Sequence, residues 1–173
     1  MRGQAKAQTQ HVMNPDKIWT RDFVLICLAN FFVVLGFQMT LPTIPIFVKE
    51  LGGSDQLIGL IVGAFTFSAL LFRPYAGKAL ETKGRQIVYL FGLSVFVVSV
   101  GSYAFITSIA VLLFMRVVQG IGFGFSSTAT GTIATDLIPP SRRGEGMGYF
   151  GVSGNIAMAL GPALGLSLVG KIS

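Results

Sequence analysis

Arg116 is the residue whose type and position most strongly suggest chemistry, because it interrupts a long apolar stretch. The uncharged residues 86–115 precede it and the uncharged residues 117–135 follow it. A guanidinium within a membrane is costly unless it faces a polar interior or a partner, so such an arginine marks a functional site by default. We therefore expect a functional role for Arg116, with an inert buried arginine as the alternative.

Few other side chains could do chemistry. The sequence has one histidine, His11, in a polar tail, and one cysteine, Cys27, in an apolar run. Its seven acidic residues stand in the N-terminal tail, at the ends of the apolar runs or between them. A membrane-embedded enzyme needs a nucleophile with a base, or a metal cluster, within its spans. We therefore expect no enzyme, no metal site and no cofactor.

The elements that must position Arg116 are membrane-spanning helices. Of the 173 residues, 52% are apolar and 12% are charged, about half the charge of a soluble domain. The stretch 87–135 would exceed twice the thickness of a bilayer as one helix, so it must fold back near 106–109. Pro42 and Pro45 are expected to end the first span. The sequence predicts an all-α polytopic membrane protein with spans at about 22–41, 56–77, 87–106, 109–135 and 146–169.

The basic residues predict the orientation. Ten lysines and arginines fall on the side of the N-terminus and two on the other side, which predicts a cytoplasmic N-terminal tail, residues 1–21, and a multi-pass protein of the cell membrane. The net charge of +6 lies in short segments between apolar runs, so we expect no nucleic-acid partner. Five spans ending at Ser173 suggest an incomplete chain, whose C-terminal half or another subunit is missing.

The residues that follow Arg116 form a recognisable pattern. Segment 112–124 resembles the fourth-span signature of the major facilitator superfamily, RxxQGxGxG. The matching positions are Arg116, Gln119, Gly120, Gly122 and Gly124. The resemblance implies a secondary transporter in which six spans form an N-terminal bundle with a substrate cavity between two such halves, so this chain would hold five helices of that bundle.

A second resemblance lies after the second run. Segment 77–86 looks like the superfamily's loop signature, GxxxD(R/K)xGR(R/K), with matches at Gly77, Gly84 and Arg85 and with Glu81 in place of aspartate. The resemblance implies that Glu81 caps a helix of the other half, that Arg85 pairs with Asp136, and that these contacts lock the outward-facing state. The alternative is that these are ordinary cytoplasmic loop charges.

The fifth span carries a third signature, which resembles that of drug:proton antiporters, G(x8)G(x3)GPxxGG. The positions that correspond to it are Gly148, Ala157, Gly161, Pro162 and Gly165, with Ala157 and Leu166 in place of glycines. The resemblance favours export, with protons as the coupling ion. Independently, Gly154, Ala157, Gly161 and Gly165 fall on one helix face, which predicts close helix packing. Pro162 can act as a hinge or leave a static bend.

Uncharged polar residues within the spans could line a substrate cavity. Asn30, Gln38 and Asn155 must each find a partner or face water. With several phenylalanines they are candidates for a cavity that binds a small molecule.

The leading hypothesis is thus proton-coupled efflux of small molecules by alternating access. The alternatives are a uniporter or nutrient symporter of the same superfamily, and a non-transporting fragment or half-size unit that oligomerises through its small-residue faces.

Overall fold

Five long helices make up the part of the chain that the structure describes. The computed structural model describes residues 17–172, with side chains to Leu168, so His11 and most of the predicted tail lie outside it. The elements are α1 (Arg21–Glu50), α2 (Asp55–Thr82), α3 (Arg85–Gly101), the 3₁₀ turn η1 (Ser102–Phe105), α4 (Ile109–Leu137), the 3₁₀ turn η2 (Pro140–Arg142) and α5 (Arg143–Ile172). All five helices are long and apolar enough to cross a membrane.

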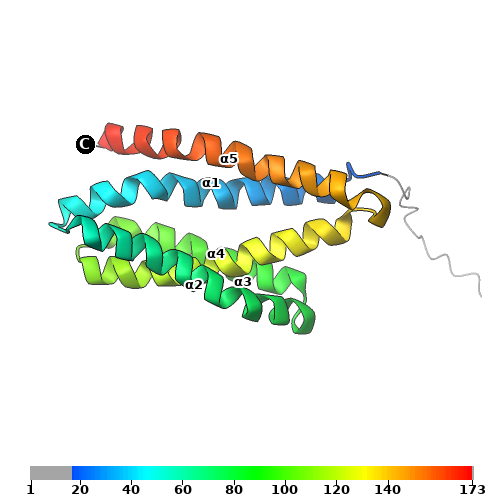
Figure 1. Ribbon diagram of the computed structural model, residues 1–173, viewed down its shortest axis with the longest axis horizontal. Helices are drawn as coiled ribbons and strands as arrows, with labels where there is room; N and C mark the ends of the chain where they lie inside the picture. Colours follow the sequence, from blue (N-terminus) through cyan, green and yellow to red (C-terminus); the bar gives the residue numbers. More distant parts are fainter. Residues whose placement is uncertain (1–16, 173) are drawn as a thin grey trace, which may run out of the picture.

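The helices form an elongated bundle with two groups (Figure 1). α1 packs along α5, α4 packs against both α2 and α3, and smaller contacts between α1 and α4 join the groups. One end of the bundle, which we call the basic end, holds the starts of α1, α3 and α5 and the ends of α2 and α4. This end carries most of the described lysines and arginines, including Lys17, Arg21, Lys78, Lys83, Arg85, Arg142 and Arg143.

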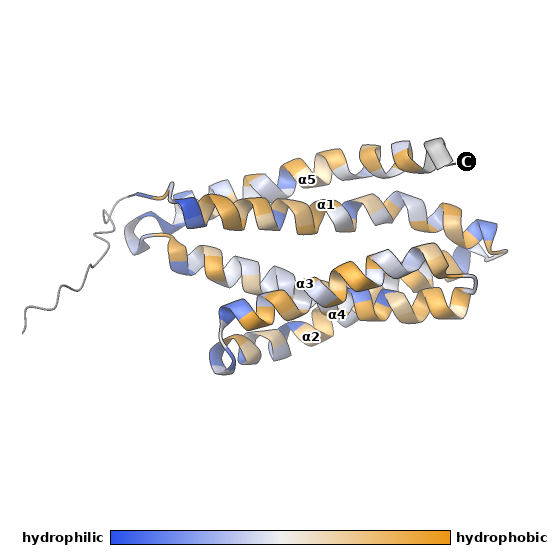
Figure 2. Ribbon diagram, turned by 180° about the vertical axis from the view of Figure 1, so that it is seen from behind, coloured by the Kyte–Doolittle hydropathy of each residue, from blue (hydrophilic) through white to orange (hydrophobic). Residues whose placement is uncertain are grey.

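The outer surface of the bundle is largely apolar, and polar side chains are buried inside it. Phe67, Val98 and Phe105 are among many large apolar side chains on the outside, while Arg116 and Gln119 are 1% and 0% exposed. Figure 2 shows hydrophobic colour along the helices and hydrophilic colour concentrated at their ends. Such helices suit lipid, where polar groups must be satisfied inside the bundle.

The first helix does not end where the sequence predicted. α1 continues through Pro42 and Pro45 to Glu50, so the predicted end near residue 41 is wrong. Ile44 and Val48, which follow the prolines, are buried with Ile61 of α2, and this burial favours continuing the helix. Membrane helices tolerate proline because neighbouring groups can satisfy the freed carbonyls.

The second helix is also longer than predicted. Gly77 and Glu81, expected in a loop, belong to the last turns of α2, which ends at Thr82. The connection to α3 is short and contains Gly84, whose φ of 86° lies in the left-handed region that favours glycine. The predicted fold-back between the third and fourth spans is confirmed by η1 and the start of α4 at Ile109, while α4 and α5 extend past the predicted 109–135 and 146–169.

Glycines let α4 approach its neighbours closely. A Cβ on Gly120 would lie 2.4 Å from the carbonyl oxygen of Phe65 on α2. A Cβ on Gly122 would lie 2.6 Å from the backbone nitrogen of Phe96 on α3, and one on Gly124 would lie 2.8 Å from the carbonyl oxygen of Ala69 on α2. These close approaches explain how α4 packs tightly against both α2 and α3.

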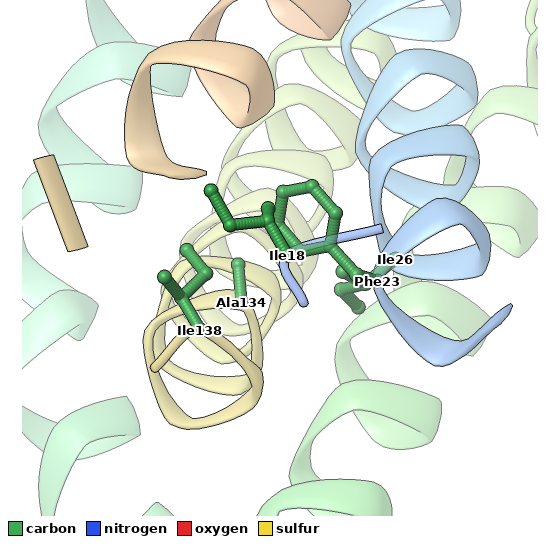
Figure 3. Packing of buried hydrophobic residues seen from close by; sticks show 5 residues of the cluster. All are labelled: Ile18, Phe23, Ile26, Ala134 and Ile138. Carbon is green, nitrogen blue, oxygen red and sulfur yellow. The ribbon is translucent and has the colours of Figure 1, made fainter. Parts of the chain in front are cut away.

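The basic end is closed by an apolar cluster that includes a residue before α1. Ile18 is 1% exposed and packs with Phe23 and Ile26 of α1 and with Ala134 and Ile138 at the end of α4. Figure 3 shows these side chains meeting between α1 and α4. The segment that leads into α1 is therefore anchored to the helix bundle.

The glycine contacts yield a stability prediction. Gly122→Ala forces a methyl group against the backbone of α3, and overpacking of this kind costs about 1–3 kcal/mol. We expect a lower midpoint of thermal unfolding in detergent, followed by circular dichroism. The matched control is Gly131→Ala on the same helix, because a Cβ there meets nothing within 4 Å. Equal midpoints for the two variants would contradict the packing of α3 on α4.

Candidate functional site

The candidate site is built around Arg116, whose side chain is almost fully enclosed. Arg116 lies seven residues after Ile109, the first residue of α4, so it is about 10 Å from that end of the helix. Only 1% of the surface of Arg116 is exposed. A cation at this depth needs polar or aromatic neighbours, and the bundle provides both kinds.

Three polar side chains from three elements form a hydrogen-bonded network with Arg116. Its Nη1 donates to Oε1 of Gln119 at 2.9 Å and to Oγ1 of Thr40 on α1 at 3.4 Å. The hydroxyl of Tyr103 in η1 donates to the same Oε1 of Gln119. Gln119 is one helical turn beyond Arg116, so the spacing of three residues lets the two side chains meet.

Aromatic rings supply the second kind of contact. The guanidinium carbon of Arg116 lies 5.5 Å from the ring centroid of Phe65 and 6.0 Å from that of Tyr103. Phe65 is itself stacked on Phe37 of α1, with centroids 4.6 Å apart and planes 12° apart. Cation–π contacts of this kind gain strength when water is excluded.

Some hydrogen-bond donors of the Arg116 guanidinium nevertheless have no partner in the part of the chain that the structure describes. Nε and Nη2 of Arg116 and Nε2 of Gln119 are buried and have no hydrogen-bond partner among the described residues. The three ion pairs of the described chain join other residues. A guanidinium with a free edge can bind a carboxylate or another planar anion through paired hydrogen bonds.

The sequence identified only part of this site. Arg116 and Gln119, which match one signature, contact each other, whereas the glycines that follow them serve helix packing. Thr40 and Tyr103 were missed, because they come from other elements, and Phe65 was expected only among the phenylalanines of a cavity. Their only sequence signal is a polar or aromatic side chain within an apolar run, and many residues of this chain share it.

The structure places Arg85 and Asp136 in an ion pair at the basic end. Nε of Arg85, the first residue of α3, contacts Oδ2 of Asp136 in the last turn of α4. Both belong to helix ends and not to loops, and both side chains are half-exposed. Glu81, in the last turn of α2, adds a further attraction for Arg85. The pair joins the ends of α3 and α4 in a place that water can reach.

Some residues of the fifth-span signature pack against α1, and others lie in open space. Ala157 is buried, and a Cβ on Gly161 or Gly165 would lie 2.4 Å from Cβ of Gln38 or the carbonyl oxygen of Met39 on α1. The predicted packing face is thus confirmed at these positions, with α1 as the neighbour. A Cβ on Gly148 meets nothing within 4 Å. α5 is continuous through Pro162.

The polar residues predicted to line a cavity are dispersed. Nδ2 of Asn30 donates to Oγ of Ser153 at 3.0 Å, which ties α1 to α5, and Gln38 lies against Gly161. Asn155 is exposed. A separate cavity of about 520 Å³ opens between α2, α4 and α5. It is lined by Arg73, Ser127, Thr128, Gly131, Thr132, Thr135 and Met147.

Comparison with known proteins assigns this arrangement to a family. The family model for the Major Facilitator Superfamily matches residues 26–173. The chain belongs to the major facilitator superfamily. This membership agrees with the expectation that the chain is not an enzyme. Together with the five apolar helices, it shows that the chain is a multi-pass membrane protein of this superfamily.

Two curated relatives are similar to most of this chain. It is 28% identical to the quinolone resistance protein NorA of Staphylococcus aureus over 143 residues, which cover 82% of this chain and 37% of the relative. It is 29% identical to multidrug resistance protein 2 of Bacillus subtilis over 147 residues, which cover 84% of this chain and 37% of the relative. The aligned part therefore spans 37% of the length of each relative.

The uncompensated charge of Arg116 predicts the effect of adding a carboxylate beside it. Gln119→Glu retains an acceptor for Nη1 and for Tyr103 and supplies the missing negative charge. We expect the midpoint of thermal unfolding to rise by about 2–4 °C, the shift that ~1 kcal/mol produces in a chain of this size. The rise should vanish when Arg116→Met is added. A lower midpoint for Gln119→Glu alone would show that this superfamily member already compensates the charge.

Proposed function

We propose that this chain forms part of a secondary transporter that exports small molecules across the cell membrane by alternating access, in exchange for protons. The observation that carries the proposal is the buried guanidinium of Arg116 with its free edge, in a member of the major facilitator superfamily. The printed names of both relatives refer to drug resistance, which supports export over uptake. The fifth-span signature supports the same direction.

Arg116 provides a fixed positive charge to which an anionic group can bind during transport. The described spans hold no carboxylate beside it, so the proton-carrying acid would come from another part of the transporter. A nearby positive charge favours the ionised form of a carboxylic acid. In this proposal Arg116 promotes release of the transported proton, and an anionic group of the substrate can replace the acid.

The ion pair between Arg85 and Asp136 is proposed to act in the conformational change. An exposed pair of this kind contributes about 0–1 kcal/mol, so it can form in one state and break in the other at modest cost. With the N-terminus in the cytoplasm, the pair and Glu81 would lie at the cytoplasmic surface. Opening at this end would then require their contacts to rearrange.

The cavity between α2, α4 and α5 is proposed to form part of the substrate path. The hydroxyl groups of Thr128, Thr132 and Thr135 donate to carbonyls of the preceding turn, at 2.7, 2.9 and 2.9 Å. Each hydroxyl oxygen therefore keeps a lone pair that can accept a hydrogen bond. Arg73 adds a donor, so the wall suits a substrate with both donor and acceptor groups.

Transport in vesicles tests the proposed function. The full transporter that carries this chain is reconstituted in liposomes, and the movement of a fluorescent lipophilic cation and of a quinolone is followed with and without an imposed proton gradient. We expect uphill movement of either compound only with the gradient, and collapse when a protonophore is added. Gradient-independent equilibration would indicate a uniporter, and movement in the same direction as protons would indicate a symporter. No movement of either compound would contradict the drug-efflux proposal.

Arg116→Lys tests the role of the guanidinium in that assay. Lysine keeps the charge but has no planar fork, so it cannot bind an anion with paired hydrogen bonds. We expect transport to fall about tenfold, because a hydrogen bond to a charged group contributes about 1.5–3 kcal/mol. The control is Arg143→Lys at an exposed position at the start of α5. Transport by Arg116→Lys at the parent rate would remove Arg116 from the mechanism.

A further inference from the structure

Tyr103 contacts the central arginine in two ways, although no sequence signature includes it. Its hydroxyl donates to Oε1 of Gln119, the oxygen that also accepts Nη1 of Arg116. The face of its ring lies 6.0 Å from the guanidinium carbon. Tyr103 thus acts on Arg116 through the amide of Gln119 and through its own ring.

The connection between α3 and α4 holds Tyr103 in this place. η1 ends at Phe105 and α4 begins at Ile109, so only three residues separate the two elements. Ile106 and Leu112 belong to an apolar cluster beside the connection, and Tyr103 packs against that cluster. Packing therefore fixes the ring, and the hydroxyl group is aimed at Gln119.

The hydroxyl group of Tyr103 stabilises the orientation of the Gln119 amide in which its oxygen faces Arg116. An amide end can rotate by half a turn, which exchanges its oxygen for an NH₂ group. Because Nη1 of Arg116 can only donate, the oxygen of Gln119 must face it, and the hydroxyl of Tyr103 adds a second hydrogen bond to that oxygen. A rotated amide would place NH₂ against Nη1, donor against donor. Tyr103 therefore keeps Nη1 bound and leaves Nε and Nη2 as the free edge.

We propose that Tyr103 is a positioning residue that orients Arg116 through Gln119 and so sets which edge of the guanidinium meets the transported group. The inference rests on the proposed transport function for its consequence, while the orientation itself can be measured without transport. Phenylalanine keeps the ring, its packing and its contact with the cation, so Tyr103→Phe removes the hydroxyl bond alone.

The first measurement is proton–nitrogen correlation NMR of the full chain in detergent. The Nε–H signal of Arg116 is assigned as the one absent from Arg116→Lys. In Tyr103→Phe we expect this signal to shift, because Gln119, the neighbour of the guanidinium, loses one of the hydrogen bonds that hold it in place. The control is Tyr75→Phe, because Tyr75 is 62% exposed on α2 and should leave the signal unchanged.

The second measurement is a double-mutant cycle in the vesicle assay. We expect Tyr103→Phe to lower transport about fivefold in the parent protein and to have no further effect in the Arg116→Lys background, because the two residues act through one network. A merely structural role would lower transport by the same factor in both backgrounds, together with the midpoint of thermal unfolding.

The two measurements separate failure of this inference from failure of the proposed function. An Arg116 signal that is unchanged in Tyr103→Phe would overturn the positioning role. Equal losses in both backgrounds would overturn it as well. If Arg116→Lys transports at the parent rate, the transport role of Arg116 fails, while the NMR signal still decides whether Tyr103 orients the guanidinium.

Discussion

The burial of one positive charge among apolar helices is the constraint on which the rest of this structure depends. Arg116 can be enclosed only if neighbouring helices come close enough to supply polar and aromatic contacts. The glycines after it allow this approach: Gly120 admits the backbone of α2 at Phe65, and Gly122 admits that of α3. Phe65 is also the residue whose ring lies beside the guanidinium. The arginine and the glycines of one signature thus serve a single arrangement, in which the glycines bring the arginine's neighbours into place.

The Arg116 site lies where the two groups of helices contact each other. α1 and α5 are held together by Gly161, Gly165 and the hydrogen bond from Asn30 to Ser153, while α2 and α3 are held to α4 by its glycines. Thr40 of α1 reaches Arg116 at 3.4 Å, compared with 2.9 Å for Gln119 on the same helix as Arg116. Movement between the groups would therefore act first on the bond to Thr40 and leave the contact with Gln119 intact.

The sequence predicted those features that depend on spacing along one helix. The five spans, the fold-back before Ile109 and the packing face of α5 all follow from helical periodicity and bilayer thickness. Features that depend on contacts between helices were missed. Pro42 was expected to end α1, but burial of Ile44 and Val48 against α2 favours continuation. Tyr103 reaches Gln119 only because the connection to α4 is short.

The uncharged character of the shell around Arg116 is consistent with a binding role. A carboxylate at position 119 would compensate the charge permanently and so weaken the attraction for an anionic group at the free edge. Gln119, Thr40 and Tyr103 instead hold one nitrogen, Nη1, directly or through a shared acceptor, and leave Nε and Nη2 with their hydrogen atoms unshared. The rings of Phe65 and Tyr103 moderate the cost of burying the cation without neutralising it. The bundle thus stabilises the position of the guanidinium more than its charge.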